Sequence, residues 1–325
     1  MVIRKPEMFK QAECGRGKNL IIQILIFFAV FVVNSMLQSI LPSIYMGVEI
    51  VKTFASYPPG VFNEVVVEAL IEAAMGSVNG RIYMLLTLFS TVFGILVPIF
   101  FCKLIEKRPL SSMGFVKKNA FRDYFIGLGI GFLMFGAVVL INVLTGAISI
   151  EGVNKNLSVI SVVYILIFFV GFMIQGASEE VLVRGYFMTS LGSKHNLWIA
   201  LLISSGMFGL LHIGNPGFTI LGFVNIILVG ILFGLYIICF DNIWGACALH
   251  TMWNFVQGNF YGIPVSGLEI SDSVFITTIN EDLEFINGGT FGAEGGFTTT
   301  IVMLLCIGGL LLYMKKTGKF VEKEN

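Results

Sequence analysis

Residues 158–190 read SVISVVYILIFFVGFMIQGASEEVLVRGYFMTS, and no charged side chain occurs between Ser158 and Ser178. A helix that crosses a hydrocarbon core of about 30 Å needs about 20 apolar residues, so this stretch predicts a membrane-spanning helix. Glu179, Glu180 and Arg184 then follow within the same apolar run. Ionisable groups inside a span cost several kcal/mol and usually mark a functional site. One segment therefore indicates both the fold and a place where chemistry could occur.

The composition of the whole chain agrees with a membrane protein. Hydrophobic residues make up 56% and charged residues 12%, the mean hydropathy is +0.89, and soluble domains carry about 25% charged residues. The fold class predicted is an all-α, polytopic bundle of transmembrane helices surrounded by membrane lipid. The formal net charge is zero, which gives no indication of a nucleic-acid partner. Five cysteines lack CxxC spacing and are interpreted as free thiols.

Charge-poor runs of suitable length predict eight spans. They are approximately 19–41, 82–102, 124–145, 158–190, 197–212, 218–240, 243–257 and 297–314. The fifth and seventh are short, which suits helices packed inside the bundle better than helices facing lipid.

The charges of the connections predict the orientation, because Lys and Arg concentrate in cytoplasmic loops. The N-terminal segment, the connection 103–122 and the C-terminal tail are basic, whereas 258–298 carries six acidic residues and no Lys or Arg. If the eight spans cross the membrane in alternating directions, all the basic segments lie on the same side of it. The prediction is a multi-pass protein of the cell membrane, with both termini cytoplasmic and 258–298 outside.

Two connections on the outer side have their own patterns. Glu64, Glu68 and Glu72 recur at four-residue spacing within 43–80, which indicates an amphipathic interfacial helix. The Gly-, Thr- and acid-rich segment 258–298 suits a small hairpin or a lid. We divide the chain into N-terminal spans with the amphipathic outer segment (1–120), a catalytic helical core (121–257), the acidic extracytoplasmic segment (258–298), and a last span with its basic tail (299–325).

Polar residues of the second half fall on shared helix faces. Residues four apart lie on one face, which pairs Glu180 with Arg184, Phe208 with His212, and His250 with Asn254. Glu179 is rotated by about 100° from Glu180 and stays free for another role. At a rise of about 1.5 Å per residue, Glu179, His212 and His250 lie roughly 10–22 Å from the cytoplasmic ends of their spans, so all three could meet near the middle of the membrane.

A carboxylate and two imidazoles around one point can activate water. Either the carboxylate takes the proton directly, or Glu179, His212 and His250 hold zinc or another divalent metal that makes the water more acidic. Each residue also has a structural interpretation. A single histidine in a membrane span is as often a structural hydrogen-bonding residue as a catalytic one. Glu180 and Arg184 would then form a structural ion pair. Phe208 would serve packing or form a pocket wall, and Trp253 would belong to the core. Five ionisable residues on three nearby spans favour a site over this structural interpretation.

Three motifs carry a family resemblance. EEVLVR (179–184), FGLLH (208–212) and HTMWN (250–254) match the patterns EExxxR, FxxxH and HxxxN. In this order they resemble the motifs of the CPBP family, the CAAX proteases and bacteriocin-processing enzymes also called the ABI family, which includes the type II CAAX prenyl endopeptidases. Each motif alone is weak, whereas the ordered set is specific. It covers about residues 120–257, so 1–120 and 258–325 lie outside the resemblance.

The resemblance implies an intramembrane protease and a role for each matched residue. Glu179 would activate water with help from His212, and His250 and Asn254 would stabilise the oxyanion. Glu180 and Arg184 would support the site or bind substrate. The family is described both as metalloproteases and as metal-free glutamate enzymes. HExxH is absent from the sequence, so the cofactor stays open between these two descriptions.

The implied substrate is a membrane-associated protein or peptide. Family members process prenylated CAAX proteins or act in peptide maturation, bacteriocin immunity and secretion. Two rival functions must be considered. A transporter would also place charges at mid-membrane, but it would show paired repeats and broken helices in both halves, whereas the spans of the first half carry no charge and no partner repeat is visible. A non-catalytic scaffold or immunity protein would have lost part of the constellation, and every member is present.

Overall fold

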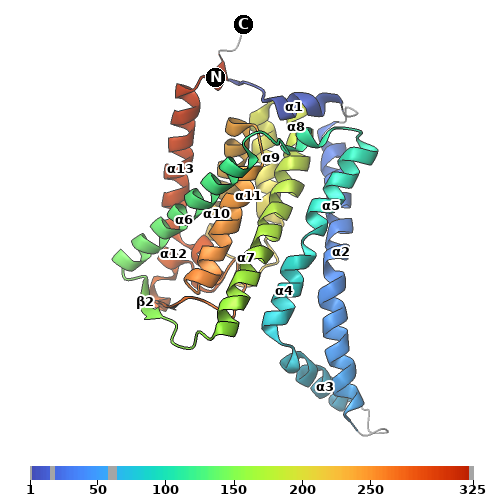
Figure 1. Ribbon diagram of the computed structural model, residues 1–325, viewed down its shortest axis with the longest axis vertical. Helices are drawn as coiled ribbons and strands as arrows, with labels where there is room; N and C mark the ends of the chain where they lie inside the picture. The colour runs from blue at the N-terminus through green and yellow to red at the C-terminus, as the bar shows by residue number, and fades with distance from the viewer. Residues whose placement is uncertain (1, 15–18, 58–63, 322–325) are drawn as a thin grey trace.

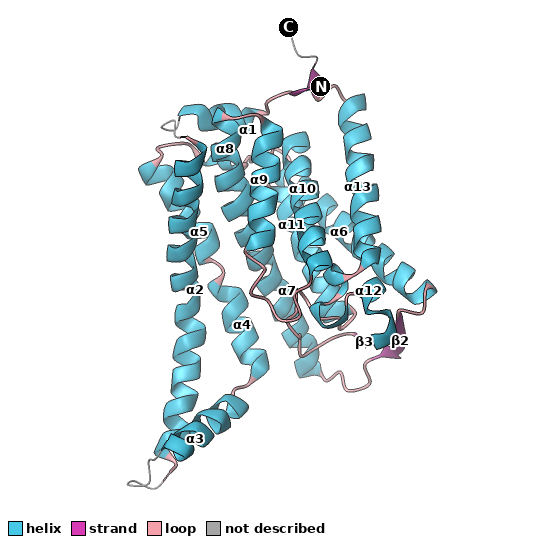
Figure 2. Ribbon diagram, turned by 180° about the vertical axis from the view of Figure 1, so that it is seen from behind, coloured by secondary structure: helices cyan, strands magenta, loops and turns pink. Residues whose placement is uncertain are grey.

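The computed structural model describes residues 2–14, 19–57 and 64–321, and it is an all-α bundle (Figures 1 and 2). The apolar runs identified in the sequence form its long helices. The helices are α1 (Glu7–Gln11), α2 (Leu20–Ala55), α3 (Glu64–Ser77), α4 (Gly80–Ser90), α5 (Phe93–Phe100), α6 (Ala120–Leu144), α7 (Val159–Glu180), α8 (Thr189–Lys194), α9 (Leu197–Leu210), α10 (Ile220–Phe240), α11 (Trp244–Phe255), α12 (Glu284–Asn287) and α13 (Phe297–Lys316). Two antiparallel pairs of short strands join β1 (Val2–Ile3) to β4 (Phe320–Val321) and β2 (Ile148–Val153) to β3 (Phe275–Ile279).

Every predicted span coincides with a helix of the bundle. In the described part of the chain, six helical segments are long and apolar enough to cross a membrane: 20–55, 80–105, 120–144, 159–194, 220–240 and 297–316. The other two predicted spans are α9, with 14 residues, and α11, with 12. α11 is buried almost throughout, as its shortness predicted. α9 is buried in part: eight of its 14 residues are buried, whereas its apolar residues Ile199, Leu202 and Leu210 are exposed.

The helix that carries the first motif, EEVLVR (179–184), changes from an α-helix to a π-helix within this motif. α7 ends at Glu180, and a π-helical segment, Val181–Met188, joins it directly to α8. Every residue of this π-helical segment is buried. Short π-helical stretches inside α-helices are rare and frequently occur at functional sites. The change of winding therefore lies within the motif 179–184.

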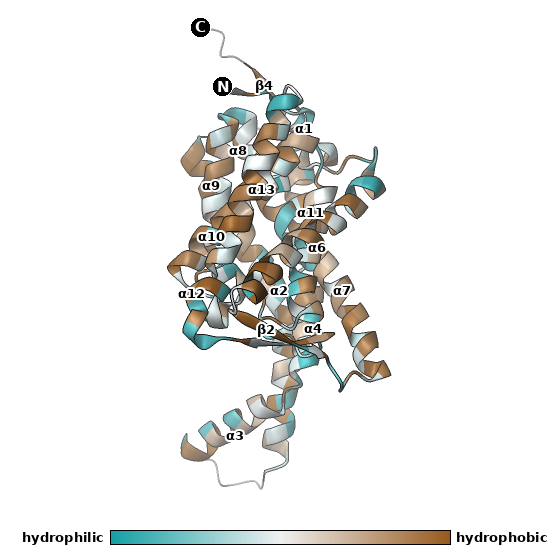
Figure 3. Ribbon diagram, turned by 90° about the vertical axis from the view of Figure 1, so that its left-hand side faces the viewer, coloured by the Kyte–Doolittle hydropathy of each residue, from teal (hydrophilic) through white to brown (hydrophobic). Residues whose placement is uncertain are grey.

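The outer faces of the long helices are apolar (Figure 3). Leu133, Val159 and Leu305 are among the many large apolar side chains that are exposed. An apolar surface of this extent is unfavourable in water and favourable in contact with lipid tails. Lipid is therefore the solvent of this surface, as the composition indicated.

The two ends of the bundle carry the segments that differ in charge. Figure 1 shows both termini, α1 and α8 at one end, and α3, α12 and the β2–β3 pair at the other. The basic connection 103–122 lies at the end with the termini, where Gly114 packs against Met8. Arg16, Lys18 and Lys323, which contributed to the basic ends, lie outside the described residues. The structure thus separates the basic and acidic segments, and which end faces the cytoplasm stays a prediction.

Cysteine labelling in intact cells tests that orientation. In a background with the exposed Cys14 replaced by serine, a cysteine at position 281 is expected to react with a membrane-impermeant maleimide, and one at position 117 only after permeabilisation. Both positions are exposed, so reactivity reports the side of the membrane. Labelling of position 281 only in permeabilised cells would reverse the orientation.

Small residues let α6 approach the helix that carries the third motif. A Cβ atom on Gly131 would lie 2.7 Å from the backbone oxygen of Leu249, next to His250, and one on Gly127 would clash with the backbone of Gly245. Glycines at this spacing permit close backbone contact between membrane helices. The position of His250 on α11 therefore depends on these two glycines, which leave room for α11 to approach the backbone of α6.

Gly131→Ala is expected to lower the thermal midpoint in detergent, because overpacking a tight contact costs about 1–3 kcal/mol. Gly129→Ala is the matched control, since it lies on the same helix with open space around its Cβ position. It should leave the midpoint unchanged or raise it, because alanine favours a helix by up to about 1 kcal/mol over glycine. Equal midpoints for the two variants would show that the contact does not matter.

The outer segment 258–298 is built into the bundle. Its strand β3 pairs with β2 from the α6–α7 connection, so the hairpin considered from the sequence is wrong. β3 pairs with β2, which lies far away in the sequence, and a pattern within 258–298 alone could not indicate this partner. Asp272 forms an ion pair of 2.6 Å with Arg81 at the start of α4, and the Asn287 side chain donates to the backbone oxygen of Ala147. The segment is thus anchored both to the start of α4 and to the α6–α7 connection.

The helix predicted from the glutamate spacing is present as α3, and Glu64, Glu68 and Glu72 are all exposed on it. It follows α2, whose 36 residues span about 54 Å and so exceed a hydrocarbon core of about 30 Å. Figure 1 shows α3 at the tip of the resulting α2–α4 projection.

Candidate active site

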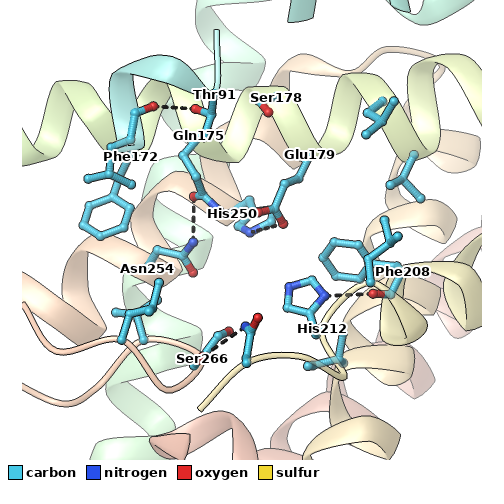
Figure 4. Close-up of a pocket in the computed structure, with 18 of the residues that line it drawn as sticks. Thr91, Phe172, Gln175, Ser178, Glu179, Phe208, His212, His250, Asn254 and Ser266 are labelled. Atoms are coloured by element: carbon cyan, nitrogen blue, oxygen red, sulfur yellow. Dashed lines mark hydrogen bonds and ion pairs between the residues drawn. The ribbon is translucent and has the colours of Figure 1, made fainter. Parts of the chain in front are cut away.

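The residues singled out in the sequence meet around one cavity between the helices (Figure 4). Its volume is about 270 Å³. Six of these residues line it: Glu179, Phe208, His212, His250, Trp253 and Asn254. Glu180 and Arg184 lie behind the wall and are fully buried. The expectation that three helices bring their polar residues together at similar depth is met by this arrangement.

Glu180 is the centre of a buried ion-pair network. Its Oε1 atom lies 2.9 Å from Nη1 of Arg184 and 2.9 Å from Nδ1 of His250. The side chains of Glu180 and Arg184 are 0% exposed. The Arg184 guanidinium also lies 4.1 Å from the ring centre of Phe208, which is cation–π distance. Glu180 is therefore compensated by a cation and positions His250, and no part of it faces the cavity.

Glu179 occupies a different environment, although it is the next residue. Its side chain is 28% exposed, and it lines the cavity. Oε1 accepts a hydrogen bond from Nε2 of Gln175, whose own oxygen accepts from Nδ2 of Asn254 at 2.8 Å. Oε2 lies 3.6 Å from Nε2 of His250. A water molecule or a substrate in the cavity can therefore contact Glu179 and not Glu180.

His212 is held by the backbone of its own motif. Helix α9 ends at Leu210, so His212 lies in the following turn, although the predicted span 197–212 placed it inside the helix. Its Nδ1 is 2.8 Å from the backbone oxygen of Phe208. A carbonyl oxygen only accepts, so Nδ1 must carry the proton, and in the neutral ring Nε2 is an acceptor. Figure 4 shows this second nitrogen facing the space between the side chains.

Trp253 belongs both to the hydrophobic core and to the wall of the cavity. It is buried, and its ring meets Phe135 edge to face with 5.0 Å between the ring centres. Its Nε1 has no hydrogen-bond partner in the described part of the chain. The structural interpretation of Trp253 as packing is thus correct, and its ring also closes one side of the cavity.

Several cavity residues were not identified from the sequence. Gln175 lies one turn before Glu179, and this spacing could have revealed it. Asn34 and Gln38 of α2 also line the cavity. The first half of the chain therefore contributes to the cavity wall, and the search for ionisable residues did not indicate this because these two side chains are neutral amides. Asn215, Ser266 and Glu294 complete the polar wall.

The described side chains around the cavity are not arranged as a set of metal ligands. Among the described residues, no group of three or more His, Cys, Asp or Glu side chains is arranged to hold one. His212 and His250 both use Nδ1 in hydrogen bonds to other protein atoms. Glu179, His212 and His250 share a cavity without forming a metal-ligand cluster.

Residues 161–256 match the family described as type II CAAX prenyl endopeptidase Rce1-like. The matched segment runs from α7 to α11 and contains all three motifs. The resemblance to the CAAX proteases is thereby confirmed, and an intramembrane protease of the CAAX type is indicated in general terms. No curated protein matches the sequence.

Proposed function

We propose that this chain hydrolyses peptide bonds of a membrane-associated protein or peptide with a water molecule activated by Glu179. The observation that carries the proposal is the contrast between two adjacent glutamates. Glu179 is partly exposed in the cavity, whereas Glu180 is buried and paired with Arg184. A general base must reach the proton it removes and must not be neutralised by a cation. The family match over the same helices supports this assignment.

The proposed reaction begins with a water molecule between Glu179 and Nε2 of His212. Glu179 takes a proton from the water while the water oxygen bonds to the carbonyl carbon of the substrate, and the carbonyl electron pair moves to the oxygen. When the tetrahedral intermediate collapses, the C–N bond breaks and Glu179 returns the proton to the leaving nitrogen. The products are a carboxylic acid and an amine. His212 offers a second acceptor that orients the water.

We assign stabilisation of the oxyanion to His250 and Asn254. Nδ1 of His250 donates to Glu180, which compensates the positive charge of the imidazolium, and the imidazolium donates through Nε2 to the negative oxygen. One proton on Nδ2 of Asn254 is used by Gln175, and the second remains for the substrate. Glu180 and Arg184 are thus proposed to position catalytic groups without contacting the substrate.

The substrate is proposed to enter as an extended segment, because a cavity of about 270 Å³ holds only a few residues at once. CAAX-type processing and the maturation of unmodified peptides both present such segments. We propose that prenylation is not required. Purified protein that cleaves only farnesylated peptides and leaves the unmodified versions intact would contradict this.

The function is tested by incubating detergent-purified protein with candidate peptides and identifying new termini by mass spectrometry. Cleavage is expected with the unmodified chain and with Glu284→Gln, a control at an exposed glutamate. It should be absent with Glu179→Ala. Treatment with a strong chelator should leave the rate unchanged, because no step is assigned to a metal. Cleavage that persists in Glu179→Ala would assign the activity to another protein or another base.

A further inference from the structure

A second carboxylate reaches the cavity from outside the family segment. Glu294 lies in the short turn 293–295 that precedes α13, within the acidic outer segment. It lines the same cavity as Glu179, His212 and Asn254, although its side chain is nearly inaccessible, with a residue exposure of 7%. The three motifs assign no role to this residue.

The side-chain hydrogen bonds of Glu294 within the described chain all go to one of its two carboxylate oxygens. Oε2 accepts from the backbone N–H of Ser266 at 2.6 Å, from the Ser266 hydroxyl at 2.8 Å and from Nε2 of Gln257 at 3.4 Å. These bonds hold the turn at Ser266, whose φ of 47° lies in the left-handed region. Within the described residues, Oε1 has no hydrogen bond and neither oxygen has an ion pair with Lys or Arg. The hydrogen bonds of Oε2 are explained by a structural role in holding this turn. Oε1 is not used by the described part of the protein and is available to bind a ligand.

The charge of the cavity favours a cationic ligand. Among the described residues that line it, two are glutamates and none is a lysine or an arginine. The charge of Arg184 lies behind the wall, where Arg184 and His250 share the negative charge of Glu180. With His250 as an imidazolium, the three carboxylates Glu179, Glu180 and Glu294 still outnumber the two cations. Burial raises the pKa of Glu294, although the hydrogen bonds from Ser266 and the electrostatic interaction with His212 oppose this effect. A buried carboxylate without a cation is unfavourable, and pairing with a cation relieves that cost.

We propose that Glu294 is a specificity-determining residue whose Oε1 binds the ammonium or guanidinium group of a lysine or arginine side chain in the peptide substrate. The inference rests on the proposed function. It adds a substrate class, namely segments with a basic residue near the cleaved bond. The outer segment then does more than cover the site, because it contributes the group that selects the substrate.

The test compares peptides that carry a single lysine at successive positions around the mapped cleavage site with peptides that carry norleucine there. Norleucine has nearly the same length without the charge. At one position or at two neighbouring positions, lysine is expected to raise kcat/KM by about 10- to 100-fold, the range of a charge-assisted hydrogen bond. Glu294→Gln should reduce this ratio to about one, and Glu284→Gln should leave it unchanged. No preference at any position, or an equal loss for both peptides in Glu294→Gln with the ratio preserved, would overturn the proposal.

A binding measurement separates this inference from the proposed function. Fluorescence anisotropy with the Glu179→Gln variant measures the affinity for the same labelled peptides without cleavage. Tighter binding of the lysine peptide that disappears in the variant Glu179→Gln, Glu294→Gln upholds the inference even if the unmodified chain cuts nothing, in which case only the proposed function fails. Equal affinities, or no binding of either peptide, would overturn the inference even if cleavage occurs.

Discussion

Glu179→Gln is expected to lower the turnover number by about 10²–10⁴-fold, the usual contribution of a general base, with little change in the thermal midpoint. Glutamine keeps the shape of the side chain and can still accept the hydrogen bond from Gln175. It cannot take a proton from water. Glu179 has no Lys or Arg ion pair among the described residues, and His250, whose Nε2 lies 3.6 Å from Glu179, keeps its hydrogen bond to Glu180 when Glu179 is neutralised.

Turnover of a cleaved peptide and the thermal midpoint in detergent decide this prediction together. The control is Glu284→Gln, which makes the same chemical change at an exposed site of the outer segment. A Glu179→Gln protein that retains most of its activity, alongside a Glu180→Gln protein that has none at equal stability, would place the base at Glu180.

The second large effect is expected on stability, at the buried pair. Glu180→Gln should lower the free energy of unfolding by about 3–5 kcal/mol, because it leaves Arg184 as an uncompensated charge in the interior. Some activity should remain, since the base is intact, although His250 loses the charge that compensates its imidazolium. The loss is therefore expected to divide between stability and the catalytic rate.

A double variant distinguishes charge from shape in this prediction. Glu180→Gln combined with Arg184→Met removes both charges and keeps comparable volumes, so it should be more stable than Glu180→Gln alone. Thermal midpoints of the two single variants and the double variant measure the coupling. Additive losses in the double variant would show that the 2.9 Å contact between Glu180 and Arg184 contributes no net interaction energy.

The fold and the central residues were predictable because they depend on local patterns. Spans follow from the length of apolar runs, and all eight predicted runs coincide with helices. The pairing of Glu180 with Arg184 follows from helical spacing, since both residues lie on one continuous helical segment. Glu179, His212 and His250 were expected near one point, and all three line one cavity.

Contacts between segments far apart in the sequence were not predictable in the same way. β2 pairs with β3 across more than one hundred residues, and the position of Glu294 depends on a Gly-rich turn that has no periodic pattern. Asn34 and Gln38 were missed because neutral amides do not stand out in an apolar helix. The termination of α9 before His212 was also missed, because the apolar pattern continues past the last helical residue.

The arrangement of the N-terminal segment has a consequence for the order of folding. β1 pairs with β4, the backbone N–H groups of Glu7 and Met8 donate to the Asp241 carboxylate after α10, and Lys5 contacts the end of α8. Residues 2–14 leave the ribosome before any of these partners exists. During synthesis the contacts of this segment can therefore form only in stages: Ser193 and Asp241 become available before α13 is made, whereas the β1–β4 pairing requires residues that follow α13. Completion of this end of the bundle thus depends on nearly the whole described chain.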